Sequence, residues 1–97
     1  MLKGKNVVVT GGGRGIGRGI TEQLLEAGAS VVIAQRQALE DDLRDHPQVY
    51  FVEADLASME SPGLIAQFAQ EQLGGIDVLV NNAGVMFEKS IDDMTEH

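Results

Sequence analysis

A glycine-rich segment at residues 10–17 (TGGGRGIG) directly follows the apolar run Val7-Val8-Val9, and a helical pattern begins within its last residues. This order of strand, glycine turn and helix suits the binding of a pyrophosphate. Residues without a Cβ atom let backbone N–H groups come close to phosphates, and a helix N-terminus adds partial positive charge. No Gly-Lys-Ser/Thr is present, which argues against a nucleoside-triphosphate P-loop. The segment therefore predicts a pyrophosphate site.

Three more polar segments follow apolar runs: Gln35-Arg36, Asp55-Leu56 and Asn81-Asn82-Ala83-Gly84. Each alone would pass for an ordinary turn or helix start. In a parallel sheet, however, ligands bind beyond the carboxyl ends of the strands. If the apolar runs are parallel strands, these segments meet the glycine turn at one edge of the sheet. Together they predict a single binding site.

The elements that must position this site alternate along the chain. Short apolar runs predict four strands, at residues 6–10, 30–34, 49–52 and 78–80. Helical patterns between them predict three helices, at about 15–27, 38–44 and about 59–73. Gly28 and Gly74-Gly75 stand where helices end. For the third helix, Ser61-Pro62 reads as an N-cap followed by proline at the first helical position, with Ser58 as the alternative cap.

The predicted inward side chains of the helices follow a period close to four residues. They are Ile16, Ile20, Leu24 and Leu25 in the first helix, Leu39 and Leu43 in the second, and Leu64, Ile65, Phe68 and Ala69 in the third. The strands are apolar throughout, which is typical of parallel strands buried on both faces. We therefore predict an α/β fold, a Rossmann-like doubly wound parallel sheet with its first four strands in the order βαβαβαβ, as one domain over residues 1–97.

Composition narrows the classes of partner. The net charge of −8 argues against nucleic acid and anionic membranes. With no cysteine there is no disulfide or thiolate metal site, and His46 and His97 lack the companions of a metal centre, so no metal is expected. No apolar run approaches the ~20 residues of a membrane span, and the first residues lack the apolar core of a signal peptide. A cytoplasmic location is expected.

With these motifs in place, the chain resembles the N-terminal part of a classical short-chain dehydrogenase/reductase. The resemblance rests on Thr-Gly-x-x-x-Gly-x-Gly at residues 10–17, Asp55 after the third strand and Asn-Asn-Ala-Gly at residues 81–84, and it covers essentially the whole chain. It implies NAD(P)-dependent hydride transfer between a nicotinamide cofactor and a small-molecule alcohol or carbonyl substrate, in a homo-oligomer. It also implies cofactor-binding residues: Gly11, Arg14, Gly15, Ile16 and Gly17 at the phosphates, Asp55 and Leu56 at the adenine, and Asn82, Ala83 and Gly84 at the adenosine ribose and the approach to the nicotinamide.

The residues after the second strand bear on the choice of cofactor. NAD-binding proteins usually place Asp or Glu there to hold the ribose 2′-hydroxyl, but this chain has Gln35. Arg36 follows it, and Arg14 projects from the glycine turn, so that two guanidinium groups could clamp a 2′-phosphate. We therefore expect NADP(H) rather than NAD(H). The alternative is that Gln35 bonds both hydroxyls of an NAD ribose while Arg36 is a solvated loop residue.

The catalytic residues of the family are not among these 97. The resemblance implies Tyr-x-x-x-Lys with an upstream Ser, whereas the single tyrosine, Tyr50, has Ala54 four residues later. The chain alone is therefore expected to be inactive, with no catalytic residue of its own. Two alternatives to the front part of an enzyme are a non-catalytic dinucleotide-binding protein and a piece that completes its sheet with another chain. S-adenosylmethionine and flavin dinucleotides are disfavoured as ligands, because the spacing Gly11-x-x-x-Gly15-x-Gly17 differs from the Gly-x-Gly-x-x-Gly of most such sites.

Overall fold

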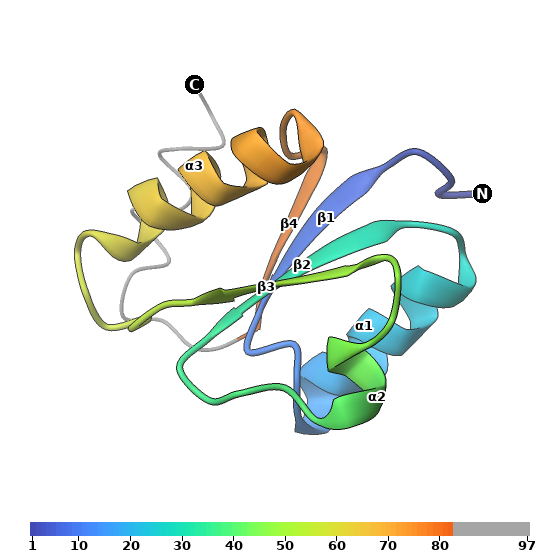
Figure 1. The fold of residues 1–97 in the computed structure, drawn as a ribbon, viewed down its shortest axis with the longest axis horizontal. Helices are drawn as coiled ribbons and strands as arrows, with labels where there is room; N and C mark the ends of the chain where they lie inside the picture. The colour runs from blue at the N-terminus through green and yellow to red at the C-terminus, as the bar shows by residue number, and fades with distance from the viewer. Residues whose placement is uncertain (83–97) are drawn as a thin grey trace.

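A computed structural model describes residues 1–82, and they form a four-stranded parallel sheet with helices on both faces (Figure 1). The elements in chain order are β1 (Asn6–Thr10), α1 (Gly15–Glu26), β2 (Ser30–Gln35), α2 (Asp41–Arg44), β3 (Val49–Glu53), α3 (Ser61–Leu73) and β4 (Val78–Asn81). The strand order is β3-β2-β1-β4, and every neighbouring pair is parallel. The predicted α/β fold and its four strands are confirmed.

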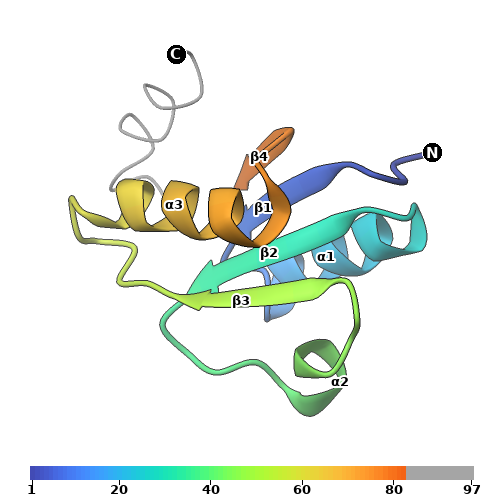
Figure 2. The ribbon, with the colours of Figure 1, turned by 45° about the horizontal axis from the view of Figure 1, so that its top comes forward.

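The central strands are apolar on both faces because a helical layer covers each face. One face carries Val7, Val9, Val31 and Ile33, which pack with side chains of α1 and α2. The other carries Val8, Val32 and Ala34, which pack against Ile65 and Ala69 of α3. Figure 2 shows α3 on one side of the sheet and α1 with α2 on the other. Tyr50 lies in β3 and packs on the α3 side.

Polar side chains hold both ends of β1 against its neighbours. At the start of the strand, the Asn6 amide N–H donates to Asp77 Oδ2 at 2.8 Å and Asn6 Nδ2 donates to the Leu73 carbonyl at 3.2 Å. At its end, Thr10 Oγ1 donates to Asn81 Oδ1 at 3.1 Å and accepts from the Asn82 N–H at 2.9 Å. The register that results pairs Val7 with Val78 and Thr10 with Asn81.

Several helix predictions were wrong in detail. Ile16 was predicted to face inward but is 80% exposed in the first turn of α1. Leu64 is 53% exposed, whereas its neighbour Ile65 is buried. The second helix begins at Asp41 rather than at residue 38, although Leu39 and Leu43 are both buried as predicted.

The start of α3 also differs from the prediction. Ser61 is the first residue of the helix rather than its N-cap, and Glu60 occupies the cap position. The Ser61 hydroxyl instead donates to the Asp55 carbonyl, and Ser58 Oγ accepts from the Glu60 N–H at 3.2 Å. Both serines therefore brace the loop between β3 and α3. Across residues 1–82 no helix has the length and apolar character needed to cross a membrane.

Candidate functional site

The turn after β1 has a backbone that favours glycine at two positions. Gly11 and Gly15 have φ angles of +65° and +56°, in the left-handed region that residues with a Cβ atom rarely occupy. The turn is also held to the neighbouring strand, because the Gly11 N–H donates to the Ala34 carbonyl at 2.8 Å. The path of the turn is therefore set by its glycines and by β2.

Gly17, predicted to line the phosphates, lies where α1 passes close to the glycine turn. It is buried in α1, and a Cβ atom there would lie 2.1 Å from the Gly11 carbonyl oxygen and 2.5 Å from Asn82 Nδ2. Such distances are far inside van der Waals contact. Glycine at this position lets α1 pack directly on the turn and on the end of β4.

The N-terminus of α1 is open at its first turn. Arg14, at the N-cap, has an extended backbone and gives no side-chain hydrogen bond to the helix, and no acidic residue stands in the first turn. Gly15 and Ile16, both predicted to line phosphates, are exposed there. The first N–H groups of a helix have no partners within the helix. Within residues 1–82 the N-cap side chain does not bond to them, which suits an anion.

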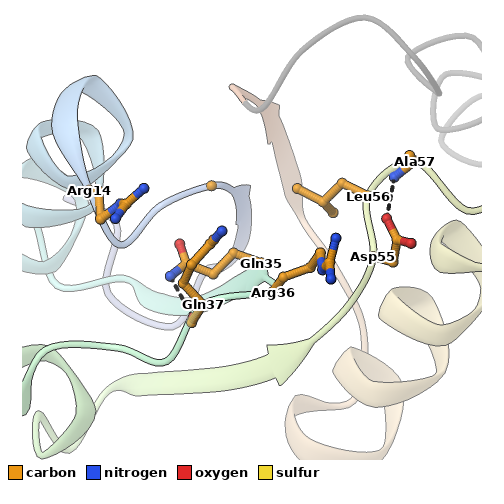
Figure 3. Close-up of a pocket in the computed structure, with 8 residues that line it drawn as sticks. Arg14, Gln35, Arg36, Gln37, Asp55, Leu56 and Ala57 are labelled. Carbon is orange, nitrogen blue, oxygen red and sulfur yellow. Dashed lines mark hydrogen bonds between the residues drawn. The ribbon is translucent and has the colours of Figure 1, made fainter.

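A pocket of about 350 Å³ lies where the turns after β1, β2 and β3 meet (Figure 3). Its lining residues are Gly11, Arg14, Gln35, Arg36, Gln37, Asp55, Leu56 and Ala57. Six of these were predicted site residues, so three separated segments of the sequence come together as expected. Gly15, Ile16 and Gly17 lie on the adjoining start of α1 and do not line this pocket. Ala83 and Gly84 fall outside the described residues.

The pocket has two guanidinium groups that have no carboxylate partner in the described part of the chain. Within residues 1–82, Arg14 and Arg36 form no ion pair, whereas Arg18 and Arg44 are each bonded to acidic side chains. Arg36 is exposed, and Figure 3 shows its side chain extending toward the segment that carries Asp55 and Leu56. In a chain of net charge −8, two cations on one pocket without partners in residues 1–82 favour an anionic ligand there.

Asp55 shapes its own loop at the edge of the pocket. Its Oδ1 accepts a hydrogen bond from the Ala57 N–H at 3.0 Å, and its carbonyl accepts one from the Ser61 hydroxyl. Leu56, between them, is half-buried and supplies the apolar part of this wall. An aspartate turn next to an aliphatic side chain offers a surface on which a flat heterocycle can lie.

Asn82 lies against the glycine turn rather than in the pocket. Its Nδ2 donates to the Gly11 carbonyl at 3.3 Å, and its backbone N–H donates to Thr10 Oγ1. The end of β4 is thereby joined to the turn that follows β1. Among the described residues, Asn82 therefore braces the glycine turn.

Arg18 joins α1 to the segment that follows the pocket's β2 loop. Its guanidinium bonds to Glu22 at 3.1 Å, to Glu40 at 2.8 Å and to Asp42. The hydrogen bond with Asp42 is the main cause of a raised Arg18 pKa and of an Asp42 pKa below its usual 3.8. Both groups stay charged at neutral pH, and their bond ties α1 to α2.

This pair predicts a contribution to stability that depends on pH. Because the folded state lowers the Asp42 pKa, ionised Asp42 stabilises the fold above about pH 4, and this contribution is lost as the pH falls through the folded-state pKa. Chemical unfolding of wild type and Asp42→Asn between about pH 2 and pH 7 tests this. The denaturant midpoint of the wild type should exceed that of Asp42→Asn at neutral pH, and the two midpoints should converge in acid. A constant difference across the range would contradict the assignment.

Three residues that shape the site were not predicted. Gln37 and Ala57 line the pocket, and each lies within two residues of a predicted one, so a wider window around each strand end would have included them. Thr21 donates from Oγ1 to the Gly12 carbonyl at 3.0 Å and is fully buried. A threonine one helical turn after Gly17, on the buried face of α1, is a weak signal in sequence.

Comparison with known proteins gives a consistent result. The family described as short chain dehydrogenase matches residues 5–97. An uncharacterized oxidoreductase of Thermotoga maritima is 45% identical, over 94% of this chain and 38% of its own length. A D-xylose 1-dehydrogenase of Caulobacter vibrioides is 40% identical, over 97% of this chain and 39% of its own length. This chain thus spans about two fifths of the length of these curated relatives.

Solved structures agree with the sequence matches. A short chain dehydrogenase from Bacillus anthracis superposes with a TM-score of 0.74 at 30% identity, covering 87% of this chain and 36% of that one. A variant of a Serratia marcescens short-chain dehydrogenase/reductase superposes with a TM-score of 0.71 at 35% identity, covering 87% of this chain and 37% of the other.

Proposed function

The chain belongs to the short-chain dehydrogenase family, and we propose that it forms the cofactor-binding part of an NADP(H)-dependent oxidoreductase. The enzyme would transfer a hydride between the nicotinamide and a small alcohol or carbonyl substrate, and it would act as a homo-oligomer. Because the chain spans about two fifths of its curated relatives, the substrate pocket would be built largely by residues beyond these.

The observation that carries the cofactor proposal is the pair of arginines on the pocket. Arg14 and Arg36 line it without a carboxylate partner among residues 1–82, and Gln35 stands where a carboxylate would repel a 2′-phosphate. Guanidinium groups bind phosphate through parallel hydrogen bonds. Two of them at the end of β2 and the start of α1 favour a ribose that carries a 2′-phosphate.

Different groups of the described residues would bind different parts of the cofactor. The uncapped N–H groups at the start of α1 and the turn at Gly11 would bind the pyrophosphate, since both offer donors without competing side chains. Arg14 and Arg36 would bind the 2′-phosphate. Leu56 and the Asp55–Ala57 turn would lie against the adenine. When bound, the reduced nicotinamide supplies the hydride for carbonyl reduction.

Proton transfer to the substrate oxygen requires a group that these 97 residues do not contain. Tyr50, the single tyrosine, packs between β3 and α3 on the sheet face and has no lysine four residues later. We propose that a Tyr-x-x-x-Lys pair in the longer enzyme supplies it. Residues 1–97 alone should therefore bind cofactor without turnover.

Binding measurements on the purified full-length protein test the proposal. Fluorescence or calorimetric titrations should give NADPH a Kd about tenfold or more below that of NADH, as expected when charged hydrogen bonds to the 2′-phosphate are added. Equal or reversed affinities would refute the preference for NADP(H). Binding of S-adenosylmethionine with no binding of either nicotinamide cofactor would refute the dinucleotide function itself.

A further inference from the structure

The side chain of Gln35 makes two hydrogen bonds inside the protein. Its Oε1 accepts from the Gly13 N–H at 2.9 Å, and its Nε2 donates to the Gln37 carbonyl at 2.8 Å. The residue is 4% exposed although it borders the pocket. The partners fix the orientation of the amide, because an N–H can only donate and a carbonyl can only accept.

These two bonds reach the neighbours of both arginines. Gly13 immediately precedes Arg14 in the glycine turn, and Gln37 immediately follows Arg36 in the loop after β2. One carboxamide therefore joins the two segments that carry the guanidinium groups of the pocket, and Figure 3 shows it in the pocket wall.

The chemistry of the two bonds requires a carboxamide. A glutamate in its ionised form could accept from Gly13 but would place a carboxylate oxygen against the Gln37 carbonyl. Gly13 is matched to this arrangement as well, since a Cβ atom there would lie 2.8 Å from both Oε1 and Nε2 of Gln35. The absence of a side chain at Gly13 thus leaves the space that the Gln35 amide occupies, although the two residues lie 22 positions apart.

We propose that Gln35 is a positioning residue that sets the preference for NADP(H) by fixing Arg14 and Arg36 around the 2′-phosphate, without itself binding the ribose. This inference rests on the proposed NADP(H) function. It opposes the alternative in which Gln35 bonds the ribose hydroxyls of NAD directly. The two hypotheses predict changes of opposite sign when the amide is removed.

The first variant is Gln35→Met, which keeps the length of the side chain and removes both hydrogen bonds. If Gln35 positions the arginines, the Kd for NADPH should rise about tenfold while that for NADH changes less than about threefold. The ratio of the two affinities should then move toward NADH. If Gln35 binds the ribose directly, NADH should lose more, and the preference for NADPH should increase. An increased or an unchanged ratio would overturn the inference.

A second variant approaches the pair from the other side. Gly13→Ala leaves Gln35 in place but inserts a methyl group where its amide lies, and the φ angle of Gly13 is not in the left-handed region. Gly13→Ala should shift the ratio of NADPH to NADH affinity in the same direction as Gln35→Met. Adding Gln35→Ala should cause little further loss of NADPH affinity, because the side chain that collides with the new methyl group is then removed. Gly19→Ala, at an open position of α1, is the control and should leave both affinities unchanged. A normal ratio in Gly13→Ala would overturn the inference even if Gln35→Met failed to fold.

The design separates this inference from the proposed function. Wild-type protein that fails to prefer NADPH contradicts the cofactor proposal before any variant is made. Wild-type protein that prefers NADPH, together with variants that keep the preference, leaves the cofactor proposal standing and removes the role assigned to Gln35.

Discussion

The Gly17→Ala variant is expected to lose about 3 kcal/mol of its free energy of unfolding, the upper part of the usual range for inserting an atom into a packed site. The added Cβ would lie 2.1 Å from the Gly11 carbonyl oxygen, a backbone atom that cannot rotate away. It would also press on Asn82 Nδ2, which bonds to that same carbonyl. To make room, α1 must move off the turn, so cofactor affinity should fall along with stability.

Gly19→Ala is the matched control for this prediction. It lies two residues along the same helix and is exposed, and among residues 1–82 no atom outside the local helix backbone lies within 4 Å of its Cβ position. Alanine should stabilise the helix there by about 0.5–1 kcal/mol. Thermal and urea unfolding of the two variants compare the same chemical change in two environments. Similar stabilities for both variants would show that α1 does not pack against the turn as described.

The Arg36→Ala variant is expected to weaken NADPH binding by about 10- to 100-fold and NADH binding by less than about threefold. This range follows from about 1.5–3 kcal/mol for hydrogen bonds to a charged group. Arg36 has no ion pair in residues 1–82, so its removal leaves no carboxylate of that segment unpaired. The loss should therefore fall on the ligand that bears the 2′-phosphate.

Arg44→Ala removes the same charge at a different place. Arg44 pairs with Asp41 at 3.2 Å and with Asp45 at 3.0 Å on α2 and does not line the pocket. Titrations of both variants with both cofactors separate a local contact from a general effect of net charge. If Arg44→Ala lowers NADPH affinity as much as Arg36→Ala does, the role of Arg36 is wrong.

The strands were the part of the fold that the sequence predicted best. Val7-Val8-Val9 and Val31-Val32-Ile33 are apolar without interruption, and such runs between helical patterns leave little choice but a sheet buried on both faces. The observed ends of β2 and β3 lie one residue beyond the predicted ends. Gln35 and Glu53 continue these strands because they pair with each other. Pairing of this kind depends on register, which periodicity does not encode.

Ile16 has the spacing of Ile20 and Leu24, but it is exposed in the first turn of α1 while the other two pack against the core. Leu39 is buried without being helical, since the loop after β2 folds it onto the sheet. Burial at these positions is decided by tertiary contacts rather than by local pattern.

The site shows the same division. That the ends of β1, β2 and β3 meet could be predicted from their order, and Gly11, Arg36 and Asp55 do line one pocket. The internal bonds of Gln35 could not, because they join segments 22 residues apart and depend on the path of the glycine turn. The role of Gly17 was likewise hidden, since the sequence does not show how closely α1 passes over Gly11.

The uniform burial of β1 has a consequence for how the chain finds its pairing during folding. In a sheet with one wet face, a slip of one residue exposes the apolar side chains and is strongly penalised. For Val7-Val8-Val9 between two dry layers, such a slip exchanges one valine for another at little cost in burial. Discrimination against the misaligned state then falls on Asn6 and Thr10, whose bonds to Asp77 and Asn82 form in only one alignment. The polar ends of β1 thus favour the native register over the shifted one. The Thr10 hydroxyl also helps to shape the binding site, because it accepts from Asn82 next to the glycine turn.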